Sequence, residues 1–126
     1  MPLDNDRVFR PVNIALLTVS DTRGIDHDTS GDILAERIIA AGHNIVDRTI
    51  LRDDTTLITA RLHNWIDDDQ VDVVISTGGT GLTGRDVTPE ALDRVKTKEI
   101  PGFGELFSWL SFASIGTSTI QSRACA

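Results

Sequence analysis

A glycine-rich segment follows an apolar run that ends near Ser76. Over residues 77–84 it reads TGGTGLTG, and four of the seven residues 78–84 are glycines. Glycine allows the backbone to adopt positive φ and allows an anion to approach peptide N–H groups closely. We therefore predict a loop that cradles a phosphate group. Its candidate ligand residues are Thr77, Gly78, Gly79, Thr80 and Gly81.

Two aspartates lie in separate loops that follow predicted strands. Asp53 comes just after a run that ends at Leu51, and Asp86 lies just beyond the glycine-rich segment. Carboxylates in such loops can hold Mg²⁺ beside bound phosphates. A simpler interpretation of Asp53, or of its neighbour Asp54, is a cap on the next helix. The simpler interpretation of Asp86 is a turn residue whose side chain bonds to its own backbone.

Arginines are the side chains best suited to bind phosphate in this acidic chain. Arg85 lies inside the glycine-rich loop, and Arg23 and Arg123 are the other two candidates. Ser20 and Asp21 follow the first predicted strand and are further candidate ligands, although a simple Ser-Asp turn would look the same.

Length and charge exclude several classes of protein. The 126 residues fit one domain, and 40% of them are hydrophobic, as in an ordinary globular chain. Twelve Lys and Arg against nineteen Asp and Glu give a net charge of −7, which repels nucleic acid. A single cysteine and an N-terminus without a signal-like segment predict a cytoplasmic protein. Its apolar runs are much shorter than the roughly 18 residues of a membrane span, so we expect no membrane association.

Two nucleotide-binding motifs and a zinc site are also disfavoured. Residues 79–84 satisfy G-x-G-x-x-G, but the following helix begins too late for a dinucleotide fingerprint. A P-loop needs Lys and then Ser or Thr after the last glycine, where this chain has Arg85 and Asp86. The three histidines and Cys125 lack the spacing of a zinc site.

The hydrophobic pattern predicts alternating strands and helices. Expected strands cover residues 12–19, 43–51 and 71–75; expected helices cover residues 31–41, the segment after Asp54 or Thr55, 89–96 and 105–113. Thr29 or Ser30 is the expected cap of the first helix, and Thr88 that of the third. Residues 115–126 could form a strand or a helix. This order predicts an α/β fold, a three-layer α/β/α sandwich with a mainly parallel sheet.

Several of these motifs together resemble a known family. The segments STGGTG at 76–81 and RDVTPEA at 85–91 are similar to the signature of the MoaB/Mog family of molybdenum-cofactor biosynthesis proteins. The likeness continues, in the same order, in residues 18–23, 52–54, 101–105 and 111–123. The segment GTSTIQSR at 116–123 resembles the MoaB branch more than the Mog branch.

The resemblance implies a single molybdopterin-binding domain over residues 1–126. It implies Mg²⁺-ATP-dependent adenylylation of the molybdopterin phosphate with release of pyrophosphate, in a homotrimer or a hexamer. Asp53 and Asp86 match the family's two acidic positions, for which it implies Mg²⁺ coordination and orientation of the phosphates. Ser122 and Arg123 fall within matched residues and are added to the candidate ligands.

Two qualifications follow from the same resemblance. Family members continue beyond residue 126 into another strand, a Pro-Gly loop and a terminal helix, so we expect the C-terminal end of the domain to be missing here. Some members of the MoaB branch lack the acidic residues of active enzymes. A non-catalytic molybdopterin-binding or carrier protein of the same fold is therefore the alternative, although Asp53 and Asp86 are both present and favour an enzyme.

Overall fold

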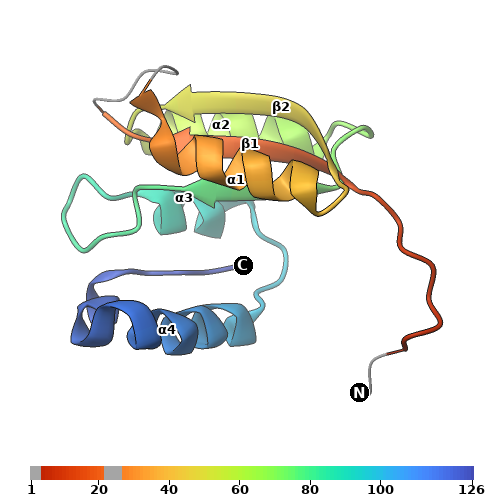
Figure 1. Cartoon of the computed structure of the whole chain (residues 1–126). Coiled ribbons are helices and arrows are strands. Elements are labelled where there is room, and N and C mark those ends of the chain that lie inside the picture. The colour runs from red at the N-terminus through yellow and green to blue at the C-terminus, as the bar shows by residue number, and fades with distance from the viewer. Residues whose placement is uncertain (1–3, 22–26) are drawn as a thin grey trace.

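A parallel sheet of three strands forms the centre of the molecule (Figure 1). The structure is a computed structural model that describes residues 4–21 and 27–126. The strands are β1 (Asn13–Val19), β2 (Asn44–Leu51) and β3 (Val73–Thr77), and β1 lies between the other two. Both pairings are parallel, as the alternation of strands and helices predicted.

Strand β1 is buried on both faces, which explains its near-continuous apolar sequence. Ala15, Leu16 and Leu17 have no exposed surface. Helix α1 (Thr29–Ala40) covers one face of the sheet, and helices α2 (Thr55–Ile66) and α3 (Thr88–Val95) cover the other (Figure 1). The three-layer α/β/α prediction is therefore confirmed. The main core lies between the sheet and the α2 and α3 side, and comprises Ala15, Leu17, Val19, Ile58, Leu62, Trp65 and Ala91.

Helix α1 begins at Thr29, so its N-cap precedes both predicted caps, Thr29 and Ser30. Asp28 is the N-cap, and its carboxylate accepts hydrogen bonds from the Gly31 amide (3.0 Å), Thr18 Oγ1 (2.8 Å) and Arg48 Nη2 (3.0 Å). The expectation of Thr29 or Ser30 as cap was wrong because Asp28, which is fully buried, also joins the helix to β1 and β2.

Helix α4 (Pro101–Ile115) and the 3₁₀ helix η2 (Gly116–Gln121) lie beyond the β3 edge of the sheet, followed by the extended residues 122–126 (Figure 1). The helix predicted over 105–113 starts earlier, since a proline suits the first turn of a helix. For residues 115–126 a strand or a helix was predicted. They form the end of α4, the short 3₁₀ helix η2 and an extended segment. No residue of α4 is buried. Among the described residues, no helix has the length and apolar character needed to cross a membrane.

Candidate functional site

The carboxyl ends of the three strands meet at one edge of the sheet. Val19 pairs with Leu51, and Thr18 pairs with Thr77, so the loops that follow these strands lie next to one another. The Ser20 amide donates to the Leu51 carbonyl at 2.8 Å, and the Asp53 amide donates to Asp21 Oδ1 at 3.0 Å. The edge where open α/β sheets bind ligands therefore gathers the predicted loops.

The glycine-rich loop needs glycine at its first two positions. Gly78 and Gly79 have φ of 91° and 67°. A Cβ at Gly78 would overlap the Val19 carbonyl, and one at Gly79 would overlap Thr88 Oγ1. Thr88 was predicted to cap α3, but the cap position is Val87. Thr88 Oγ1 instead donates to the Gly78 carbonyl at 2.8 Å and fixes the loop against the helix.

Asp53 and its neighbour Asp54 differ in their contacts, because only Asp54 is the N-cap of a helix. Asp54 caps α2 by accepting from the Leu57 amide at 3.1 Å, which settles which member of the pair is structural. Asp53 Oδ1 is buried and accepts no hydrogen bond within the described residues. Burial raises the pKa of Asp53, and the negative charges of Asp21 and Asp86 raise it further. A carboxylate in this state favours a cation or a proton nearby.

Asp86 has the turn geometry of its simpler interpretation, and it is near enough for its charge to raise the pKa of Asp53. Its Oδ2 accepts from Thr83 Oγ1 at 2.6 Å and from the Thr83 amide at 3.2 Å. These bonds, the Thr83 hydroxyl first, lower the pKa of Asp86 and keep it ionised. A Cβ at Gly81 would lie 2.6 Å from Asp86 Oδ2, so glycine is what allows this carboxylate to pack against the loop.

Arg85 forms an ion pair with Asp21 across the two loops. The Asp53 amide is the main cause that lowers the pKa of Asp21, and Arg85 adds to it. The Arg85 side chain remains 77% exposed, so it is accessible to a ligand. A small polar cavity of about 250 Å³ opens here, lined by Asp21, Arg52, Asp53, Asp54 and Arg85.

Arg123 takes a different position from the one expected of a phosphate ligand. Its Nε donates to the Gly81 carbonyl at 2.9 Å, its Nη2 donates to the Asp86 carbonyl at 2.8 Å, and the guanidinium pairs with Glu90. Ser122 Oγ lies 3.5 Å from Thr80 Oγ1. The structure thus brings both C-terminal candidates to the loop. Arg23 lies outside the described residues.

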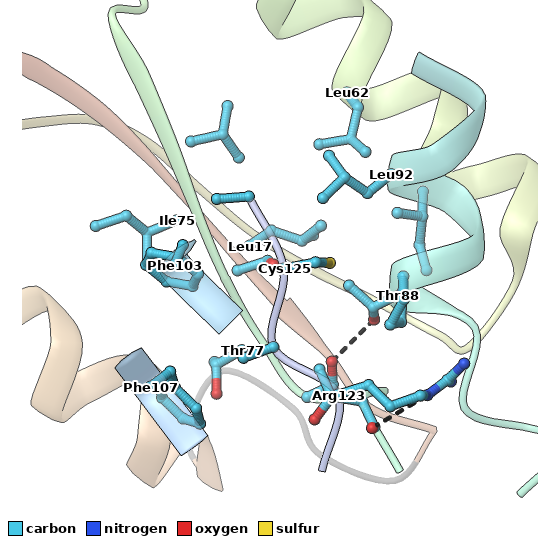
Figure 2. A pocket seen from close by; sticks show the side chains of 18 of the residues that line it. Leu17, Leu62, Ile75, Thr77, Thr88, Leu92, Phe103, Phe107, Arg123 and Cys125 are labelled. Carbon is cyan, nitrogen blue, oxygen red and sulfur yellow. Dashed lines mark hydrogen bonds between the residues drawn. The ribbon is translucent and has the colours of Figure 1, made fainter. Parts of the chain in front are cut away.

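A second, larger cavity of about 680 Å³ adjoins the loop and was not anticipated from the sequence. Figure 2 shows Phe103 and Phe107 of α4 on one side of it and Leu62 and Leu92 on the other. The lining extends from Val73–Thr77 of β3 to Ala124–Ala126. The signal that could have indicated it is the spacing of the two phenylalanines, four residues apart on one helix face.

Comparison with known proteins decides which family shares this geometry. Residues 15–125 match the family model described as "Probable molybdopterin binding domain". The chain is 51% identical over 118 residues to molybdenum cofactor biosynthesis protein B of Escherichia coli strain K12, covering 94% of this chain and 69% of that protein. The chain belongs to the MoaB/Mog family.

Solved structures agree with this membership. A crystal structure of molybdenum cofactor biosynthesis protein B superposes with a TM-score of 0.89 at 41% identity, covering 94% of this chain and 74% of that one. The tungsten cofactor synthesizing protein MoaB from Pyrococcus furiosus superposes with a TM-score of 0.82 at 33% identity, with the same coverage. The MoaB/Mog resemblance is therefore confirmed, and the protein is one of molybdenum-cofactor biosynthesis.

Proposed function

We propose that this MoaB/Mog-family protein transfers AMP from ATP to the terminal phosphate of molybdopterin. An oxygen of that phosphate attacks the α-phosphorus of ATP and forms a new P–O bond. The bond between the α-phosphorus and the bridging oxygen breaks, and pyrophosphate leaves with the electron pair. Such a transfer depends on positioning and charge neutralisation more than on proton chemistry. The family description supports molybdopterin as substrate.

The observation that carries the proposal is the state of Asp53. Its Oδ1 is buried without a hydrogen-bond donor in the described part of the chain, and two further carboxylates, Asp21 and Asp86, act on it. A purely structural aspartate would have donors, as Asp54 and Asp28 have. Mutual repulsion of this kind is maintained where a bound ligand or ion compensates for it.

The donor set fits a divalent cation. Asp53 and Asp86 would hold Mg²⁺, which when bound supplies positive charge against the nucleotide phosphates. Within residues 4–21 and 27–126, no group of three or more His, Cys, Asp or Glu side chains is arranged to hold a metal. Phosphate oxygens and water would therefore provide the other ligands, as is usual for Mg²⁺.

The remaining residues supply binding and orientation. Backbone N–H groups of the loop from Gly78 to Gly81 would receive phosphate oxygens, since glycine permits their close approach. Arg85 is the exposed cation beside them, and it can exchange Asp21 for a phosphate. Four hydroxyl-bearing residues lie at the same edge: Ser20, Thr77, Thr80 and Ser122.

An adenylyl-transfer assay with molybdopterin, ATP and Mg²⁺ tests the proposal, with pyrophosphate release and product mass as readouts. Asp53→Asn and Asp86→Asn are expected to lower kcat by about 100-fold or more, the scale for losing one charge-stabilising group. Asp68→Asn is the matched control: Asp68 is exposed after α2 and lines neither cavity, and asparagine can still accept from the Gln70 amide, so activity should persist. Tight molybdopterin binding without turnover in the unaltered protein would instead establish the carrier alternative.

We also propose that the protein forms a cytoplasmic homo-oligomer, a trimer or a hexamer. Support comes from α4, whose large apolar side chains are exposed along its whole length. Contiguous apolar surface of this extent usually marks an interaction site. Light scattering should give a mass of three or six times 13.7 kDa, and a stable monomer would contradict this part of the proposal.

A further inference from the structure

All three nitrogens of the Arg123 guanidinium form contacts within the protein. Its Nε donates to the Gly81 carbonyl (2.9 Å) and, at 3.4 Å, to the Thr80 carbonyl. Its Nη2 donates to the Asp86 carbonyl (2.8 Å), and the Arg123 amide donates to the Thr80 carbonyl at 2.9 Å. Both terminal nitrogens also contact the Glu90 carboxylate. One planar guanidinium therefore joins both ends of the loop that runs from residue 80 to residue 86.

Holding a carbonyl also sets the direction of the amide beyond it. In a planar trans peptide the C=O and the next N–H point in opposite directions. Fixing the carbonyls of Thr80 and Gly81 thus fixes the N–H groups of Gly81 and Leu82. The Gly81 amide belongs to the loop predicted to receive phosphate oxygens, and the hydrogen bonds of Arg123 to the two carbonyls set its direction and that of the Leu82 amide beside it.

The positive charge of Arg123 is neutralised by a carboxylate of the same protein. Glu90 pairs with the guanidinium, and this contact is the main cause that lowers the pKa of Glu90. The Arg123 side chain is 32% exposed, against 77% for Arg85. Of these two arginines, Arg85 is the one placed to exchange its partner for a ligand.

We propose that Arg123 is a positioning residue, which sets the glycine-rich loop and the Asp86 backbone in the geometry that binds phosphate, while Glu90 orients the guanidinium. The residue reaches the loop from the C-terminal segment, after η2 (Figure 2). The order of the loop on the sheet edge thus depends on a segment that lies far away in sequence. This role adds a positioning residue to the proposed function. It rests on that function only where activity is measured, because hydrogen exchange tests it without turnover.

Amide hydrogen exchange of the ligand-free protein tests the positioning role directly. The reporters are the amides of Thr83, Asp86 and Thr88, which donate to Asp86 Oδ2, the Thr83 carbonyl and the Gly79 carbonyl. Arg123→Gln should speed their exchange about tenfold or more, the factor expected for one lost hydrogen bond to a charged group. The Leu17 amide in β1 should be unaffected, which separates a local effect from general destabilisation.

Two further variants keep the test decisive. Arg123→Lys retains the charge but cannot span carbonyls at both ends of the loop, so it should behave like Arg123→Gln. Glu90→Gln leaves the carbonyl contacts and should speed exchange only about two- to fivefold, as for an exposed ion pair. Arg94→Gln, at an exposed arginine in the last turn of α3, is the matched control. Unchanged loop exchange in Glu90→Gln overturns the orienting role of Glu90. If the Arg123 variants fail to fold, the unaltered protein decides the role of Arg123, because exchange at Thr83, Asp86 and Thr88 as fast as in an unfolded chain overturns it.

Activity separates positioning from direct binding. If Arg123 only binds phosphate, Arg123→Lys should keep most of the ATP affinity, and ligand-free exchange should not change; that result overturns the proposal. If it positions the loop, kcat/KM for ATP should fall about tenfold in both variants, because neither restores the hydrogen bonds to the carbonyls. Absence of turnover in the unaltered protein would count against the proposed function alone, since the exchange measurement stands without it.

Discussion

The sheet with helices α1 to α3 and the C-terminal arm from Pro101 to Ala126 are built on opposite principles. Six consecutive residues of β1, from Ile14 to Val19, are buried. In α4 no residue is buried, and Trp109 is 70% exposed although the helix is strongly apolar. The first region is stabilised by its own core. The arm makes polar contacts with the loop at the sheet edge, such as the hydrogen bond from the Arg123 amide to the Thr80 carbonyl at 2.9 Å.

The candidate site draws its residues from both regions. Asp53 and the glycines stand at strand ends fixed by the core, whereas Arg123 arrives from the arm. The site therefore stands on the core of the sheet and receives one support from outside that core. Four predictions test this contrast, from the largest effect to the smallest.

Leu17→Ala should cause the largest loss of stability. Leu17 is fully buried in the core between β1 and α2, and a leucine truncated in such a site costs about 2–5 kcal/mol of unfolding free energy. Urea denaturation followed by circular dichroism measures it. Phe107→Ala in the arm is the matched truncation, at a side chain 45% exposed, and an equal loss there would contradict the contrast.

Asp28→Asn should cost about 1.5–3 kcal/mol, because it weakens charge-assisted hydrogen bonds at a fully buried position. Burial alone would raise the pKa of Asp28, but bonds from Arg48, Thr18 and the Gly31 amide outweigh it, and its pKa lies below the ordinary value of 3.8. A lowered pKa stabilises the fold above pH 3.8, and this contribution is lost as the pH falls through the lowered value.

The difference between Asp28→Asn and the unaltered protein should therefore be full at pH 6 and shrink below pH 3.8. Thermal unfolding across this range measures it. Asp32→Asn is the control, since its carboxylate also pairs with Arg48 but is 61% exposed. A difference that does not change with pH would show that the Asp28 carboxylate is not the group concerned.

Asp53→Asn should have the opposite sign. The pKa of Asp53 is raised, so its charge opposes folding once the pH rises through that value. Removing the charge should raise Tm at neutral pH by about 1–3 °C, a modest gain of the kind seen when an active-site conflict is relieved. The gain should vanish below pH 3.8, where the Asp53 carboxyl of the unaltered protein is protonated in both the folded and the unfolded state. A lower Tm would mean that Asp53 is a structural residue.

The fold could be predicted from the sequence where one local signal determined it. The unbroken apolar run before Ser20 identified β1, and the order of elements gave the parallel sheet. Capping was less predictable, because Asp28, Thr29 and Ser30 all suit a helix start. Only the tertiary contacts of Asp28 with Thr18 and Arg48 distinguish it.

The candidate site likewise contains residues that a local sequence signal identifies and one that only its tertiary contacts identify. Its glycine-rich loop, Asp53 and Asp86 were identifiable by residue type and by order along the chain. The use of Arg123 was not, because an arginine near a phosphate loop can bind either the ligand or the loop. The choice depends on where residues 122–126 run, and those residues carry no periodic pattern that would predict their path.

Trp109→Ser should have the smallest effect on the fold and a large one on assembly. Its side chain is 70% exposed, so the unfolding free energy of the single chain should change by less than about 0.5 kcal/mol. If α4 forms the subunit interface, the same change removes a large aromatic contact of the kind that dominates interfaces. Light scattering over a dilution series should then show dissociation at a higher protein concentration than for the unaltered chain. Ser in place of the exposed Ile39 of α1 is the control, and equal dissociation in both variants would mean that the exposed face of α4 is not the interface.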